Sequence, residues 1–422
     1  MPITKSRQEF RGGVTVNTVV DPKFKTNLIN IRFMTDIDPE KVAAYAMIPQ
    51  MLTSVNAKFH DSALMTRRLN SLYGAWMGGS SRHLGDIYEI SVSISYLCDR
   101  YALDGESISA EAAKLLLDCI FDPAVEDGGF QRTEFNTKKT DLLNQIDSEI
   151  NDKLSYTMNQ AFNIAYRGEP SEIRFFGTRE AVEALTFEQA YNTYLELLKT
   201  ARIEISLCGA GPFDETQKLF VEAFSREGDD FSSPKYFSPS PCKPSPEYGE
   251  LSLDVQQANL IMIFKTNGAD HLAMTVLSSL YGETPLSKLF LNIREKLSLC
   301  YFCSSAYIET KGVLYVVSGV APENIEPAKD EILRQLDAIK AGEFTDEEIE
   351  ETKLALSNAY RSIGDRAGRL DDWYHTQSLK NSDDDPEDKL KKLYTVTRDD
   401  IISAAEKIKL DTVFVLNCKE TV

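Results

Sequence analysis

Histidine is scarce in this chain of 422 residues, and that scarcity limits the metal chemistry that the chain can support. Four histidines occur, and no two lie within five residues of each other: His60, His83, His271 and His375. A helical pair of histidines at i and i+4, which would aim two imidazoles at one zinc ion, is therefore impossible. So few histidines also give no basis for a Ser-His-Asp triad.

Long apolar runs and a surplus of basic residues are missing as well. No run of 18 apolar residues occurs, and the first twenty residues hold no long apolar stretch, so we predict neither a membrane span nor a signal peptide. With 46 basic and 65 acidic residues the net charge is −19, which disfavours nucleic acid and anionic membranes as partners. Such a surface would favour basic or extended peptide ligands, although solubility alone is the simpler explanation.

Cysteine is present but unpatterned, with seven residues scattered along the chain. An odd number of cysteines without a secretion signal predicts reduced thiols and a cytoplasmic location. Cys300 and Cys303 form a lone C-x-x-C motif with no second pair to complete a zinc site. Since the motif follows a predicted helix and enters a predicted strand, we interpret both as buried, apolar thiols.

A segment rich in proline and serine near the middle divides the chain into two parts. We predict an N-terminal domain over residues 1–228, an extended, solvated linker over residues 229–246 and a C-terminal domain over residues 247–422.

The two parts repeat one order of elements. Each has an apolar strand, two helices, an alternating strand, further helices, and a last helix followed by a strand. In the first part these elements are predicted at residues 27–33, 42–53, 63–72, 88–94, 110–121, 187–198 and 203–207, and in the second at residues 259–264, 269–281, 286–297, 313–318, 325–341, 398–408 and 413–416. The repetition predicts an α+β fold of two homologous domains, each a mostly antiparallel sheet flanked by helices, and the alternation predicts one buried sheet face.

The segment over residues 291–301 holds two side chains that suit peptide recognition. Arg294 is predicted on a helix and Tyr301 just past its end. A guanidinium and a phenol can together donate hydrogen bonds to a peptide carbonyl or carboxylate. On spacing alone, a surface ion pair for Arg294 and a core position for Tyr301 are the simpler explanations.

This segment resembles insulinase-type (pitrilysin-type) zinc peptidases, whose second half carries a pattern like R-E-K-x-G-L-x-Y-S. Here the pattern stands as Arg294-Glu295-Lys296-Leu297-Ser298-Leu299-Cys300-Tyr301-Phe302, with Ser298 at the family's glycine. The resemblance covers nearly the whole chain and implies a clam-shell arrangement of the two domains. It also implies that Arg294 and Tyr301 bind substrate beside the scissile bond.

The same resemblance locates the family's metal site in the first part, where active members carry H-x-x-E-H followed by Met-Leu. Met51-Leu52 match the Met-Leu, so Ala46 and Gln50 stand at the two histidines and Pro49 at the catalytic glutamate. In the later helix over residues 130–146, Gln145 stands at the third ligand and Lys138 at a second acidic position. The resemblance therefore implies no metal, no cofactor and no catalytic residue in this chain.

The metal ligands are lost whereas Arg294 and Tyr301 are retained. This contrast favours a peptidase whose metal-binding and substrate-binding residues come from two different subunits. We expect a non-catalytic subunit that has no activity alone and adds peptide-binding residues to a heterodimer, in which a paralogue with H-x-x-E-H holds zinc. The alternative is an inert scaffold of the same fold, and no constellation supports an enzyme of another chemistry. The resemblance is greatest to the non-catalytic member of a Firmicutes pair linked to 5-aminopentanol modification of elongation factor P, a link that comes from the resemblance alone.

Overall fold

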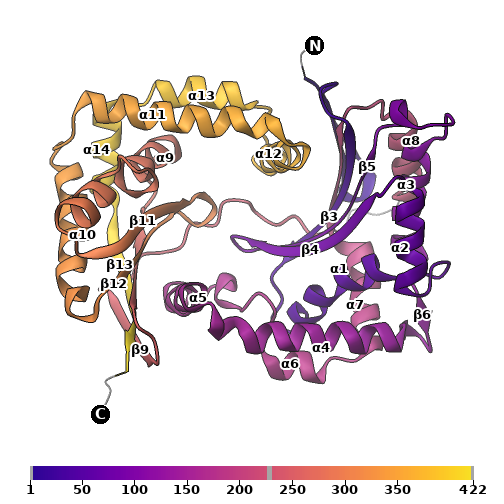
Figure 1. The fold of residues 1–422 in the computed structure, drawn as a ribbon, viewed down its shortest axis with the longest axis horizontal. Helices are drawn as coiled ribbons and strands as arrows, with labels where there is room; N and C mark the ends of the chain where they lie inside the picture. The colour runs from indigo at the N-terminus through magenta and orange to yellow at the C-terminus, as the bar shows by residue number, and fades with distance from the viewer. Residues whose placement is uncertain (1–2, 226–230, 420–422) are drawn as a thin grey trace. The chain divides into compact units, whose positions relative to one another are not determined.

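The computed structural model describes residues 3–225 and 231–419, which form two compact units (Figure 1). Unit 1 comprises Met1–Asp147, Ile173–Tyr236 and Ile363–Asp383, and unit 2 comprises Ser148–Glu172, Phe237–Ser362 and Asp384–Val422. Among the described residues, no helix combines the length and apolar character needed to cross a membrane.

The main sheet of unit 1 has six strands in the order β1-β2-β8-β3-β5-β4. Neighbouring strands are antiparallel except for the parallel pair β2 and β8. The strands are β1 (Thr4–Phe10), β2 (Val14–Val20), β3 (Thr26–Asp36), β4 (Trp76–Leu84), β5 (Ile87–Leu97) and β8 (Arg202–Gly209), and a separate small hairpin joins β6 (Val125–Glu126) to β7 (Gly129–Phe130).

The sheet of unit 2 repeats this topology with five strands in the order β11-β12-β10-β13-β9. Read from the other edge, the order matches β2-β8-β3-β5-β4 of unit 1, including one parallel pair, β13 with β9. The strands are β9 (Glu247–Leu253), β10 (Ala258–Lys265), β11 (Cys300–Ile308), β12 (Val313–Val320) and β13 (Lys409–Cys418). The predicted α+β fold of two homologous, mostly antiparallel domains is confirmed.

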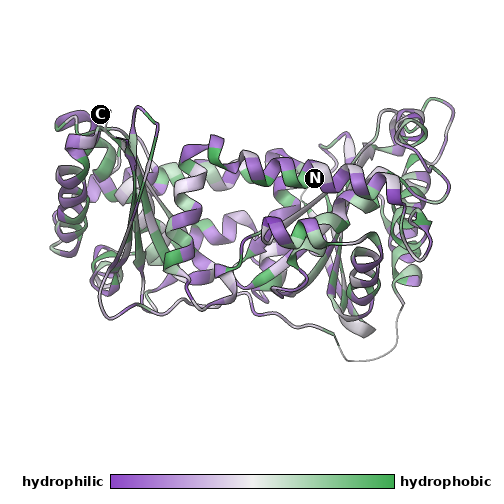
Figure 2. Ribbon diagram, turned by 90° about the horizontal axis from the view of Figure 1, so that it is seen from below, coloured by the Kyte–Doolittle hydropathy of each residue, from purple (hydrophilic) through white to green (hydrophobic). Residues whose placement is uncertain are grey.

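Helices cover one face of each sheet and bury the main hydrophobic cores. In unit 1, Ile29, Ile31 and Phe33 of β3 point into a core shared with α1, whereas Leu260, Met262 and Phe264 of β10 do the same with α9 in unit 2. Figure 2 shows the resulting stripes of hydrophilic and hydrophobic residues along the helices. The helices of unit 1 are α1 (Val42–Ser54), α2 (Ser62–Ser71), α3 (Ile108–Phe121), α4 (Arg132–Ser148), α6 (Arg179–Ala184), α7 (Phe187–Thr200) and α8 (Asp214–Ala223), and those of unit 2 are α9 (His271–Ser278), α10 (Ile325–Lys340), α11 (Asp346–Arg361), α13 (Pro386–Tyr394) and α14 (Arg398–Lys407).

Two further helices occupy the second face of the sheets, and each belongs to the unit formed mostly by the other part of the sequence. Helix α12 (Ala367–Leu379) packs on β8, β2 and β3 of unit 1, and α5 (Lys153–Ala165) packs on β10 and β13 of unit 2. The units are therefore not the uninterrupted ranges 1–228 and 247–422, and the predicted boundary between residues 228 and 229 lies outside the described residues. The expectation of one buried sheet face was also wrong, because α12 and α5 cover the second face.

The proline- and serine-rich segment contains neither helix nor strand over residues 231–246. It is nevertheless anchored rather than freely solvated. The backbone N–H groups of Ser238 and Ser240 donate to the carbonyls of Thr310 (2.8 Å) and Lys311 (2.9 Å), and the N–H of Lys243 donates to the Asp411 carboxylate (3.0 Å).

Candidate functional site

One cavity of unit 1 gathers every position at which the resemblance places metal chemistry. This pocket, which we call the α1–α4 pocket, has a volume of about 270 Å³ and is lined by residues of α1, β4 and α4 and by Phe175 and Phe176. Ala46, Pro49 and Gln50 enter it from α1 and Gln145 from α4, so residues about 95 positions apart in sequence share one wall. Lys138 of α4 lines it too.

Helix α1 owes its position to an almost fully apolar surface, since ten of its thirteen residues are buried and Gln50 is exposed. Pro49 lies inside the helix, where it supplies no backbone N–H, and its carbonyl accepts a hydrogen bond from Thr53 Oγ1 (2.8 Å). Strand β4 approaches this point closely. A Cβ atom at Gly79 would lie 2.3 Å from the Pro49 oxygen, so only glycine permits this contact.

The chemistry of the α1–α4 pocket is unsuited to a divalent cation. Asp141 is the one carboxylate among its lining residues, and the Lys138 ammonium, 3.6 Å from Glu134, adds a positive charge. Structural and catalytic zinc sites need three or four strong ligands from Cys, His, Asp or Glu. In the part of the chain that the structure describes, no group of three or more such residues is arranged so that it could hold a metal ion.

Arg294 lies on an irregular helix, Phe290–Lys296, in unit 2. Its guanidinium stands over the Phe290 ring at 4.8 Å from the centroid, one helical turn away, and its Nε lies 3.8 Å from Glu295. The side chain is 44% exposed. Stacking on Phe290 restricts the rotamers of Arg294 and thereby lowers the entropic cost of binding an acceptor.

Tyr301 is 65% exposed, and the simpler expectation of a core position for it was wrong. It lies on β11, the edge strand of its sheet, where Cys300 pairs with Val320 and Phe302 with Gly319. Tyr301 is the extra residue of this β-bulge, and a bulge turns a side chain away from the normal alternation.

The turn before β11 explains a feature of the sequence pattern. Ser298 has φ 52°, in the left-handed region that favours glycine, and Ser298 is the position at which the family pattern carries glycine. The helix end, this turn and the bulge together fix the separation between Arg294 and Tyr301.

The same bulge brings Cys300 and Cys303 to one face of β11, because they pair with Val320 and Ser318, two residues apart on β12. Cys303 is buried, as predicted, whereas Cys300 is half-buried. A hydrogen bond from Cys303 lowers the pKa of the Cys300 thiol, and the same bond together with burial raises the pKa of Cys303 well above its usual value.

Sequence reasoning missed a cluster of buried charges, which we call the α12 charge cluster: Arg32, Glu89, Glu204, Asp371 and His375. The first three lie on β3, β5 and β8, and the last two lie one turn apart on α12. His375 Nδ1 lies 2.6 Å from Glu204 and its Nε2 2.6 Å from Glu89, while Arg32 donates to Asp371 at 2.6 Å. Each of the five side chains is at most 2% exposed.

Mutual pairing keeps these groups charged despite burial. Burial by itself lowers the pKa of His375, but Glu204 and Glu89 raise it to about 9. Burial raises the pKa of Glu89, whereas His375 and Arg32 lower it to about 2. The signal in the sequence was a single charge between apolar neighbours in three strands, at Arg32, Glu89 and Glu204.

Comparison with known proteins shows which proteins this chain resembles. Residues 184–356 match the family model described as Peptidase M16 inactive domain. The chain is 27% identical over 413 residues to the probable inactive metalloprotease YmfF of Bacillus subtilis (strain 168), with 97% of each chain covered. It is 21% identical over 300 residues to an uncharacterized zinc protease of Rickettsia bellii (strain RML369-C), covering 67% of this chain and 69% of that protein.

Solved structures share the fold. A conserved protein from Enterococcus faecalis V583 superimposes with a TM-score of 0.92 at 24% identity over 99% of both chains. A peptidase M16 inactive domain from Pseudomonas fluorescens gives 0.79 at 15% identity, covering 99% of this chain and 98% of that one.

The duplicated fold and the lining of the α1–α4 pocket define a peptidase-like protein without the metal-binding residues of a zinc peptidase. The chain is an inactive-type homologue of the M16, or insulinase-type, peptidase family.

Proposed function

We propose that the chain is the non-catalytic subunit of a heterodimeric M16 peptidase and contributes Arg294 and Tyr301 to a site whose zinc is held by an H-x-x-E-H paralogue. The observation that carries the proposal is a contrast between two places in one chain. The α1–α4 pocket offers one carboxylate and a lysine, whereas Arg294 and Tyr301 are exposed and positioned by stacking and by a bulge.

Two features support a peptide as the ligand. The edge strand β11 presents backbone groups on its unpaired side, and such an edge can pair with an extended chain. The guanidinium of Arg294 and the Tyr301 hydroxyl supply donors for carbonyl or carboxylate oxygens of that chain. The link to elongation factor P modification remains a prediction from the resemblance.

The test mixes the purified chain with its H-x-x-E-H paralogue and follows cleavage of a fluorogenic peptide library. Alone, the chain should cleave nothing and bind no stoichiometric zinc, and the mixture should be active with zinc in the paralogue. Arg294→Ala should lower kcat/KM by about 10- to 100-fold, because a hydrogen bond to a charged group contributes roughly 1.5–3 kcal/mol.

Arg361→Ala is the matched control, since Arg361 is 60% exposed in the same unit and pairs with Glu387. If Arg294→Ala leaves the activity of the mixture unchanged, the shared-site proposal fails. Co-purification of the two chains without any gain in peptidase activity would instead favour the scaffold.

A further inference from the structure

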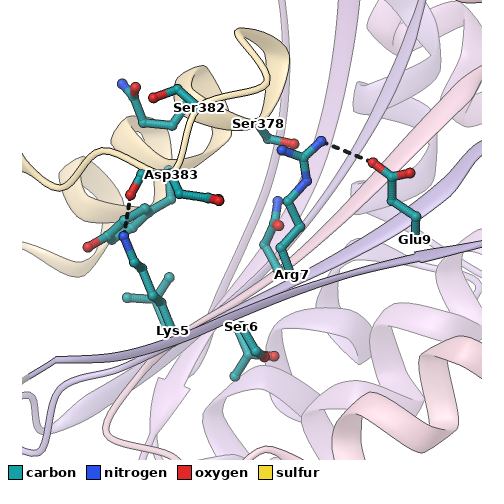
Figure 3. A pocket seen from close by; sticks show the side chains of 12 residues that line it. Lys5, Ser6, Arg7, Glu9, Ser378, Ser382 and Asp383 are labelled. Carbon is teal, nitrogen blue, oxygen red and sulfur yellow. Dashed lines mark hydrogen bonds and ion pairs between the residues drawn. The ribbon is translucent and has the colours of Figure 1, made fainter.

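A second cavity of unit 1 shares no lining residue with the α1–α4 pocket. This β1–α12 cavity has a volume of about 480 Å³, and its walls come from β1, β2, α12 and the residues that follow α12. Figure 3 shows Lys5, Arg7 and Glu9 pointing from β1 toward α12, with Ser6 on the other side of the strand. The volume lies within the range usual for small-ligand sites.

Two buried N–H donors without hydrogen-bond partners belong to residues that line this cavity. Arg7 and Asn17 lie directly opposite each other in the antiparallel pair of β1 and β2, so their side chains share one face of the sheet. Arg7 Nε and Asn17 Nδ2 are both buried and have no hydrogen-bond partner, and Asn17 is only 5% exposed. Arg7 uses Nη2 on Glu9 at 3.2 Å, which leaves the Nε group for another acceptor.

Unsatisfied buried donors are costly, so two of them on residues that line one cavity favour an occupant that brings acceptor oxygens. The charges around the cavity select among such occupants. Lys5, whose Nζ binds the Asp383 carbonyl and lies 5.3 Å from the Tyr374 ring centroid, adds a second cation beside Arg7. Glu9 and Asp383 balance both cations, so a singly charged carboxylate is better matched than a dianionic phosphate.

We propose that the β1–α12 cavity binds the carboxylate group of a small organic acid or of a peptide C-terminus. Arg7 and Asn17 act as the donors. A guanidinium presents parallel N–H groups that match the two oxygens of a carboxylate, and the Asn17 amide adds a donor from the neighbouring strand. The site is independent of the proposed pairing with a zinc-bearing paralogue, since it uses other residues.

Calorimetric titration of the full chain with three probes tests the proposal. N-acetyl-trialanine with a free C-terminus should bind, whereas the same peptide with a C-terminal amide should bind at least tenfold more weakly. Acetate, the third probe, distinguishes a small organic acid from a peptide C-terminus as the ligand. Acetate binding as tight as that of the peptide indicates a small organic acid, and much weaker acetate binding indicates a peptide C-terminus. Equal affinities for the free and amidated peptides, or no binding of either carboxylate at millimolar concentration, would overturn the proposal.

Two variants assign the donors. Arg7→Gln and Asn17→Leu should each weaken binding of the carboxylate probe at least tenfold, and Asn17→Leu should also raise the Tm of the unliganded chain because a buried unpaired donor is removed. Arg68→Gln, which removes an equal charge from α2 of the same unit, should leave the affinity unchanged. Unchanged affinity in Arg7→Gln would reject the assignment even if Asn17→Leu failed to fold.

Discussion

His375 is held between Glu204 and Glu89 at 2.6 Å on each side, in a place that water does not reach. We expect His375→Gln to lower the free energy of unfolding by about 3–5 kcal/mol, because the two carboxylates lose a buried cation that offsets their charge. Denaturant unfolding followed by circular dichroism measures the change.

The exposed His60 provides the control, and His60→Gln should change stability by less than about 0.5 kcal/mol. Adding Glu204→Gln to His375→Gln should recover part of the loss, because one unpaired charge is removed. If the double variant is no more stable than the single one, charge pairing is not what His375 supplies.

The same cluster predicts how stability depends on pH. The pKa of His375 is about 9 in the folded chain against 6.5 for an ordinary histidine, so its contribution is complete below pH 6.5 and disappears as the pH rises through 9. Glu89 has a pKa of about 2 against 4.5, so its contribution is complete above pH 4.5 and is lost as the pH falls toward 2.

Stability should therefore be greatest between about pH 4.5 and 6.5 and should fall by about 3 kcal/mol from pH 6.5 to well above 9 through His375. Unfolding measured across that range in the parent chain and in His375→Gln checks the assignment. The alkaline decline should vanish in the variant, and an equal decline in both chains would contradict it.

At the scale of elements, α1 and α4 line one cavity, and the positions at which the resemblance places the metal ligands lie on its walls. We expect the combined variant Ala46→His, Pro49→Glu, Gln50→His and Gln145→Glu to bind one zinc ion per chain, since three ligands then converge. Replacing Pro49 also returns a backbone N–H to the helix interior. Metal analysis after dialysis measures the stoichiometry.

A variant carrying Ala46→His and Gln50→His alone should bind zinc much more weakly, because two ligands leave the ion poorly held. A folded combined variant without zinc would show that the α1–α4 pocket no longer has the geometry of a metal site.

At the scale of the whole molecule, α5 from the first part of the sequence belongs to unit 2, and α12 from the second part belongs to unit 1. Each unit therefore depends on both parts of the sequence. Without α12, a chain ending at Tyr236 would leave Arg32, Glu89 and Glu204 without Asp371 and His375. Without α5, the rest of the chain would expose Ile261 and Ile263, which pack against Ala161 and Ala165. We expect each half expressed alone to be unstable and the two co-expressed halves to associate.

Size-exclusion chromatography and circular dichroism of the separate and co-expressed halves test this expectation. A half that folds cooperatively alone with the stability of the full chain would contradict it.

The sequence by itself determined the order of elements, the duplication and the replacement of the metal-ligating residues. Hydrophobic periodicity is a local property, and the absence of histidine and glutamate from a motif needs no coordinates, so the elements around Ile31 and Ile261 and the substitutions at Ala46, Pro49, Gln50 and Gln145 could be predicted. Only tertiary structure decided which helix covers which sheet. That choice depends on contacts between residues far apart in sequence, as between His375 and Glu89, and it explains why Arg32, Glu89 and Glu204 can lie in apolar strands. Likewise, the N–H donors of Arg7 and Asn17 are buried without hydrogen-bond partners only because the folded chain places two strands and α12 around them.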